Sequence, residues 1–173
     1  MPKTPAWMAG MALAVGLAAS AAAQTPIPPS AKDFASAAAQ SDQYEIEAGR
    51  DAITQSQNPQ IKAFAQQMID DHTRASESLR QAVFASAITP PPEAMSSDQA
   101  AMLSALQSLR GSQFDRAYAN QQVLAHDQAL AVERSYAAAG TDPNLVAVAK
   151  SGIPMIQHHL QMVQRIRDMF AGG

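Results

Sequence analysis

Apolar residues recur every three or four positions along most of the chain, which is the period of an α-helix. One such stripe begins at Phe34 and continues to Ala52, and a second begins at Ile61 and continues to Leu79. No segment shows the alternation of β-branched residues that would compete as a strand. The pattern therefore predicts an all-α protein.

Capping signals divide this pattern into separate helices. The predicted starts share a side chain that can accept backbone N–H groups of the first turn, and they lie at Ser30, Asn58, Ser96 and Asp142. The predicted stops are Thr89, which precedes three prolines, and Gly140. These signals predict long helices over about 31–57, 59–88, 112–139 and 143–170, and a short helix over about 96–110. Pro154 predicts a break or kink in the last helix.

The order of these helices indicates a topology. Asn58-Pro59 and Asp142-Pro143 open two helices in the same way, and each of these helices carries a histidine further on. This suggests two helical hairpins joined by the segment 88–111, which is long enough to cross the bundle. We therefore expect a ferritin-like four-helix bundle over residues 31–171, with an extra short helix in the connection between its second and third long helices.

The N-terminal 23 residues have the pattern of a secretory signal peptide. Lys3 is the only charged residue before Lys32, an apolar run covers 6–19, and small residues at 21–23 suit the signal peptidase. Cleavage after Ala23 would leave a Pro-rich leader over 24–30 and an exported, periplasmic protein that does not span the membrane. Because the chain has no cysteine, a lipoprotein anchor and disulfide bonds are excluded.

Charge and motifs narrow the function classes. The chain carries 12 basic and 15 acidic side chains, and no basic stripe suggests a nucleic-acid partner. It shows neither a Ser/His/Asp nucleophile setting nor a Gly-rich phosphate loop. We therefore assign no catalytic and no organic-cofactor residue, and the sequence favours a non-enzymatic protein.

Each long helix carries one titratable residue on an otherwise apolar face, and these residues are Glu45, His72, His126 and His159. Each lies roughly 20–25 Å along its helix from the turn of its predicted hairpin, so all four could share one layer in the middle of the bundle. A carboxylate and three neutral imidazoles suit a divalent transition metal such as zinc, iron, manganese or copper. The sequence thus offers these four residues as candidate metal ligands.

A metal-free layer is the alternative interpretation. The same side chains could hydrogen-bond to one another, to water or to Tyr44 and Tyr118, and such a layer would fix the helix register. The Glu-x-x-His motif of di-iron carboxylate bundles is missing, because apolar residues precede each of the three histidines by three positions. Ferroxidase chemistry of the usual kind is therefore disfavoured.

Two further patterns allow more than one interpretation. Met155, Met162 and Met169 flank His158 at heptad spacing and could form a soft copper(I) site, although methionine at this spacing is more often core filler. Asp71 could orient the imidazole of its neighbour His72. Asp70 would be a surface charge that faces Arg74.

Three motifs resemble a known family. They are Tyr44-Glu45-Ile46-Glu47 followed by Asn58-Pro59-x-Ile61-Lys62-x-Phe64-Ala65-x-x-Met68-Ile69-x-Asp71-His72-Thr73, then Gly111-x-x-Phe114-Asp115-x-x-Tyr118 with His126, and Pro154-x-Ile156-x-x-His159-Leu160. The chain is similar over residues 32–166 to the domain-of-unknown-function 4142 family of exported bacterial proteins.

The resemblance implies a ferritin-like bundle in the periplasm or envelope and no established activity. The four candidate metal ligands all lie at motif positions of this family. Asp71, Asp115 and Tyr118 do so as well, and the resemblance therefore makes them candidates for hydrogen bonding to those ligands.

Two functions follow as hypotheses. The first is a non-enzymatic binding protein of the envelope, connected with stress, whose polar layer is structural. Its bundle would bind a second copy of the chain, another envelope protein or a small ligand, and its apolar helix faces suit a helical partner. The second is a periplasmic protein that stores, buffers or senses a transition metal at the polar layer. Catalysis at such a metal is a third and weaker hypothesis.

Overall fold

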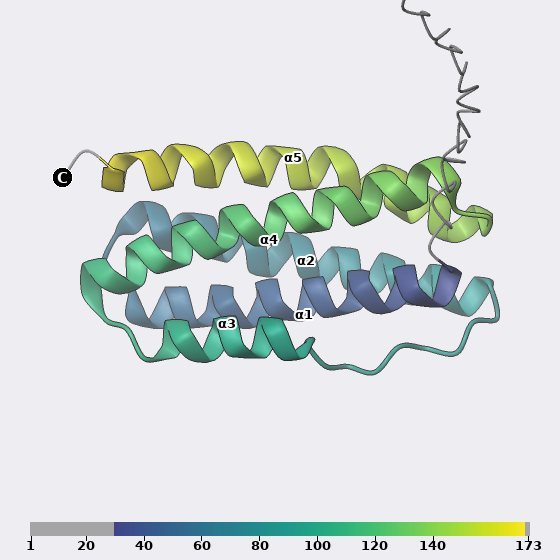
Figure 1. The fold of residues 1–173 in the computed structure, drawn as a ribbon, viewed down its shortest axis with the longest axis horizontal. Coiled ribbons are helices and arrows are strands. Elements are labelled where there is room, and N and C mark those ends of the chain that lie inside the picture. Colours follow the sequence, from purple (N-terminus) through teal and green to yellow (C-terminus); the bar gives the residue numbers. More distant parts are fainter. Residues whose placement is uncertain (1–29, 172–173) are drawn as a thin grey trace, which may run out of the picture.

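The computed structural model describes residues 30–171, and within them every regular element is helical. The five helices are α1 (Ala31–Gln55), α2 (Pro59–Ala85), α3 (Ser97–Gln107), α4 (Gly111–Ala139) and α5 (Pro143–Ala171) (Figure 1). The all-α prediction is confirmed. The predicted signal peptide, and the leader apart from Ser30, lie outside the described residues.

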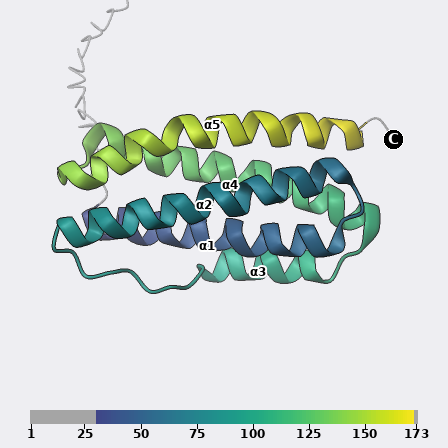
Figure 2. The same cartoon turned by 180° about the vertical axis from the view of Figure 1, so that it is seen from behind.

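The four long helices form a bundle of two antiparallel hairpins, α1–α2 and α4–α5 (Figure 1). The connection between them returns along the whole bundle, so that α2 and α4 run in the same direction, as the ferritin-like prediction requires (Figure 2). Within this connection α3 packs against α1 and α4.

The predicted capping side chains explain where four of the helices begin. Ser30 accepts a hydrogen bond from the backbone of Asp33, Asn58 accepts from Gln60 and Ile61, and Asp142 accepts from Leu145. Ser96 forms a reciprocal capping box with Gln99. These local contacts are readable from the sequence because each involves residues only two or three positions apart.

The structure bears on two predictions about where helices end or break. The predicted break at Pro154 does not occur, since α5 is one continuous helix from Pro143 to Ala171. Gly140 does end α4, but its φ of −63° lies outside the left-handed region of a usual C-terminal glycine. Glycine fits here because a Cβ atom would come within 2.6 Å of the carbonyl oxygen of Tyr136.

The interior consists of two apolar clusters with a polar zone between them. One cluster lies around the α1–α2 turn and α3 and includes Phe64, Leu106 and Phe114. The other lies at the opposite end, where Phe34 stacks on Tyr136 at a centroid distance of 4.2 Å. The buried polar side chains of the long helices are Asp42, Glu45, His72, Asp115, Gln122, His126, Glu133 and His159. Because buried polar groups are costly without partners, this zone is the natural place to look for a function.

Among the described helices, none combines the length and the apolar character that a membrane crossing needs.

Candidate metal centre

Three histidines from three helices meet in the polar zone. The ring centroids of His72 on α2 and His126 on α4 are 5.9 Å apart, and His159 on α5 lies 5.6 and 5.4 Å from them. Each histidine is at most 2 % exposed. Each can offer one ring nitrogen such that the three ligand atoms lie within 4.8 Å of one another. We call this group the three-histidine cluster.

One nitrogen of each imidazole ring lies within hydrogen-bond distance of an oxygen atom. Nδ1 of His72 lies 2.8 Å from Oδ1 of Asp42, and Nε2 of His159 lies 2.7 Å from Oδ2 of Asp71. Nδ1 of His126 lies 2.8 Å from the backbone oxygen of Gln122, one helical turn earlier. In a neutral imidazole the nitrogen that faces an oxygen carries the proton, which leaves a lone pair on the opposite nitrogen.

The opposite nitrogens are buried without a partner among the described residues, and they are Nε2 of His72, Nε2 of His126 and Nδ1 of His159. A carboxylate or carbonyl behind each imidazole is the usual arrangement around a metal ion, because it fixes the tautomer and makes the free nitrogen more basic. The cluster therefore has three buried ring nitrogens, each of which can offer a lone pair when its imidazole is neutral.

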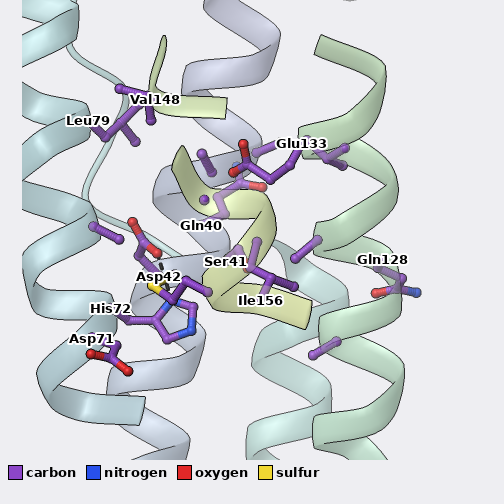
Figure 3. A pocket seen from close by; sticks show the side chains of 18 of the residues that line it. Gln40, Ser41, Asp42, Asp71, His72, Leu79, Gln128, Glu133, Val148 and Ile156 are labelled. Carbon is purple, nitrogen blue, oxygen red and sulfur yellow. Dashed lines mark hydrogen bonds and ion pairs between the residues drawn. The ribbon is translucent and has the colours of Figure 1, made fainter. Parts of the chain in front are cut away.

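The supporting carboxylates are themselves held in place. Oδ2 of Asp42 accepts a hydrogen bond from the hydroxyl of Ser76 at 3.2 Å, and Figure 3 shows Asp42 beside the ring of His72. Asp71 accepts hydrogen bonds from Arg74 and from Gln67 in addition to its contact with His159. These contacts restrict how the two imidazoles can turn.

Glu45 lies at the edge of the cluster. Its Oε1 atom is 3.6 Å from Nδ1 of His126, and its Oε2 atom is buried with no partner among the described residues. Burial raises the pKa of Glu45 to about 7, although the charge of His72 and the amide of Gln122 act against this shift. Glu45 is therefore adjacent to the three ligand atoms but not one of that close group.

The three imidazoles differ in their affinity for protons. Burial lowers the pKa of His126 to about 3 and that of His159 to about 4, so both rings are neutral at pH 7. Burial opposes the charging of His72 as well, but its contact with Asp42 and the nearby carboxylates raise its pKa. Of the three rings, His72 is therefore the one that most readily takes up a second proton.

The other predicted support residues lie in different places. Tyr118 is fully buried, and its pKa is raised by burial and by the charge of Glu45, so it belongs to the neighbourhood of that carboxyl. Asp115 precedes His126 by three turns, about 16 Å along the helix axis, and is not brought to the cluster. The hydroxyl of Tyr44 donates to Gln121 at 3.0 Å rather than to Glu45 or a histidine.

Some pairings differ from those that the sequence suggested. Asp71 holds His159 from the opposite hairpin and not its neighbour His72, whose partner is Asp42. Arg74 pairs with Asp71, while Asp70 accepts a hydrogen bond from Gln66. Neighbouring side chains on a helix point about 100° apart, so Asp71 and His72 face different partners.

Sequence reasoning missed Asp42, Gln122 and Glu133. Asp42 precedes Glu45 by three residues and Gln122 precedes His126 by four, so each shares a helix face with a predicted ligand. Glu133 follows His126 by seven residues, again on the same face. The signal is present in the sequence, but the apolar pattern of the first helix places its inward stripe on Ser41 instead of Asp42.

The spaced methionines are dispersed. Met162 packs against the apolar cluster that contains Phe64, whereas Met169 is 48 % exposed. Met155 lines a cavity of about 340 Å³, and His158 is exposed. The cavity is also lined by Asp42, Asp71, His72 and Glu133, so it adjoins the three-histidine cluster on one side (Figure 3).

Comparisons with known proteins agree with this fold. A search of curated proteins finds no match. Among solved structures, "CopM in the Cu(II)-bound form" is similar, with a TM-score of 0.70 and 17 % sequence identity over 83 % of this chain and 99 % of that one. The family profile described as "Domain of unknown function (DUF4142)" matches residues 16–166. The chain therefore belongs to the DUF4142 family, as the sequence motifs predicted.

Proposed function

We propose that this protein binds a divalent transition-metal ion through His72, His126 and His159. The main support for the proposal is that each of the three rings has one buried nitrogen without a partner. The other nitrogen of each ring lies within hydrogen-bond distance of an oxygen atom. A purely structural layer needs its polar atoms paired with one another, whereas here each ring of a close three-histidine group has an unpaired nitrogen.

The spacing suits an ion after a small adjustment. Three atoms at the corners of a triangle with sides of 4.8 Å would each lie about 2.8 Å from its centre. Bonds from a metal to imidazole nitrogen are about 2.0–2.1 Å long. Each ring would therefore need to move inward by less than about 1 Å, which changes in side-chain torsion can supply.

Charge also favours a cation at this place. Asp42 and Asp71 lie directly behind two of the imidazoles, and Glu45 lies beside the third. A divalent ion would compete with a proton for Nε2 of His72 and would compensate the buried carboxylates. Oε2 of Glu45 or a water molecule would complete the coordination.

Donor chemistry narrows the choice of metal. Imidazole nitrogen with carboxylate oxygen suits Cu(II), Zn(II), Ni(II) and Co(II), and Cu(II) binds most tightly in the general order of stability. The Cu(II)-bound form of CopM supports copper as a candidate, since its chain has the same fold. We infer storage, buffering or sensing of the metal in the periplasm, with export directed by residues 1–23.

Thermal unfolding with added metal tests the proposal. Metal-free protein is melted with Cu(II), Zn(II), Ni(II) or Co(II), and at least one ion should raise the midpoint, because a ligand that binds only the folded state stabilises it. The increase should disappear in His126→Gln and in His159→Gln. His158→Gln is the matched control, since His158 is exposed and next to His159, and it should keep the increase. If no ion raises the midpoint of the wild-type protein, the proposal is wrong.

A metal-free binding protein is the second candidate. Its supporting observation is that Asp42 and Asp71 already pair with His72 and His159 without an ion. Phe84, which is 87 % exposed on α2, would then be a contact for an envelope partner. In that case the histidine variants would lose stability equally with and without metal.

A further inference from the structure

The cavity beside the three-histidine cluster lies between the four long helices and has a volume of about 340 Å³. Much of its wall is apolar and consists of Ala37, Ala38, Ala75, Leu79, Ala129, Val132, Val148 and Ile156. Its lining also includes the exposed residues Arg74 and Gln128, so the cavity reaches the surface of the bundle. In Figure 3, Glu133 and His72 border the same space, with Asp42 between them. Small-molecule sites in proteins begin at about this size and have mainly apolar walls.

The charged groups of this cavity are paired with one exception. Asp42 contacts His72 and Ser76, and Asp71 contacts His159 and Arg74. Glu133 is only 9 % exposed, and its Oε2 atom is buried with no partner among the described residues. The cavity therefore contains one carboxyl group with no hydrogen bond or ion pair to the described residues.

The backbone of α5 makes room for this carboxyl group. A Cβ atom at Gly152 would lie 3.3 Å from Cδ of Glu133, which is tighter than an ordinary contact. The missing side chain thus lets the carboxyl group lie close to α5. Burial and the charge of Asp42 raise the pKa of Glu133 to about 8, although the charge of His72 acts against this shift.

We propose that the cavity is a binding site for a small organic monocation of the alkylammonium class, whose ammonium group pairs with Glu133. One carboxyl group without an ion-pair partner favours a ligand with a single positive charge, and the apolar walls suit an alkyl chain. A divalent metal ion fits this cavity less well, because the other two carboxylates that line it, Asp42 and Asp71, are already paired with His72 and His159. The site adjoins the three-histidine cluster, because His72 belongs to both, but it requires no ion there.

Isothermal titration of the metal-free protein with n-butylammonium tests this proposal. The neutral n-butanol and the anionic butanoate are isosteric comparison probes. We expect n-butylammonium to bind more tightly than both, and Glu133→Gln to weaken its binding by about tenfold or more, as for other charge-assisted contacts. Glu93→Gln, at an exposed position, is the matched control and should bind like the wild type.

Proton release gives a second measurement. Glu133 is mostly protonated at pH 7, and pairing with a cation would ionise it, so binding should release close to one proton. Titrations in buffers with different ionisation enthalpies measure this release. The charged groups that line the cavity beside it are Asp42 on α1 and Asp71, His72 and Arg74 on α2. Because these remain in Glu133→Gln, that variant should release no proton if Glu133 is the source.

Two results would overturn the proposal. One is equal affinity for n-butylammonium and n-butanol, which would make the cavity an apolar or water-filled space without a charge requirement. The other is unchanged binding and proton release in Glu133→Gln, provided that its circular dichroism spectrum and melting curve show a folded bundle. Neither result depends on whether a metal binds, so this proposal and the metal proposal can fail separately.

Discussion

Nε2 of His159 lies 2.7 Å from Oδ2 of Asp71, although 88 positions separate the two residues in the chain. The contact joins α5 to α2, and hence one hairpin of the bundle to the other. The same carboxylate pairs with Arg74 at the surface, so Asp71 connects a buried imidazole to an exposed guanidinium. A substitution at Asp71 therefore tests directly whether the carboxylate behind an imidazole increases the affinity of the cluster for a metal ion.

Asp71→Asn should lower the affinity of the three-histidine cluster for its metal by about 10- to 100-fold, because a neutral amide makes the ring of His159 a weaker donor. Asp70→Asn is the matched control and should keep wild-type affinity, since Asp70 contacts only Gln66 at the surface. Competition with a coloured chelator measures both affinities. Equal affinities would mean that the Asp71–His159 contact serves packing alone.

Asp42→Asn should lower the pKa of His72. The hydrogen bond with Asp42 and the charge of that carboxylate both help to raise this pKa against the effect of burial. Nuclear magnetic resonance titration of the imidazoles in metal-free protein measures the change. Ser76→Ala, which removes a hydrogen bond to the other oxygen of Asp42, should have a much smaller effect. An unchanged pKa in Asp42→Asn would contradict the pairing.

Glu133→Gln should become more stable than the wild type as the pH rises. In the unfolded chain this carboxyl group loses its proton near pH 4.5, whereas in the folded chain it keeps the proton until about pH 8. Between these pH values the unfolded state therefore binds fewer protons than the folded state, and the wild-type protein loses stability as the pH rises. The Glu133→Gln variant has no ionisable group at this position and does not lose this stability. Urea unfolding should show a gain for the variant of about 1 kcal/mol at pH 5 that increases to about 4 kcal/mol at pH 8. A constant difference across this range would mean that Glu133 ionises freely in the fold.

Gly49→Ala should destabilise the bundle by about 1–3 kcal/mol. In an ordinary helix interior the same change stabilises by about 1 kcal/mol, so the sign of the effect is informative. Here α1 and α2 approach closely, and a Cβ atom at Gly49 would lie 2.9 Å from Cγ1 of Ile69 and 3.0 Å from the backbone oxygen of Ala65. Chemical denaturation measures the free energy of unfolding. A stabilised variant would show that the helices separate at little cost.

The sequence by itself determined the helices and most of their limits. Ser30, Asn58, Ser96 and Asp142 cap their helices through contacts with residues two or three positions away, so a linear pattern contains the whole interaction. The residues that interrupt the apolar stripes are also readable, since helical periodicity assigns a side chain to a face. For the same reason the sequence places His72, His126 and His159 on the inward faces of their helices.

Only the tertiary structure decided which atoms meet. The rotation of α1 about its axis decides whether Ser41 or Asp42 faces His72, and the position of α5 along α2 decides whether His159 reaches Asp71. Such rotations and shifts depend on how side chains from distant segments fit together, and no local pattern contains that information. The same reason explains why sequence reasoning missed Glu133. Its significance comes from a cavity that exists only when the four long helices are packed.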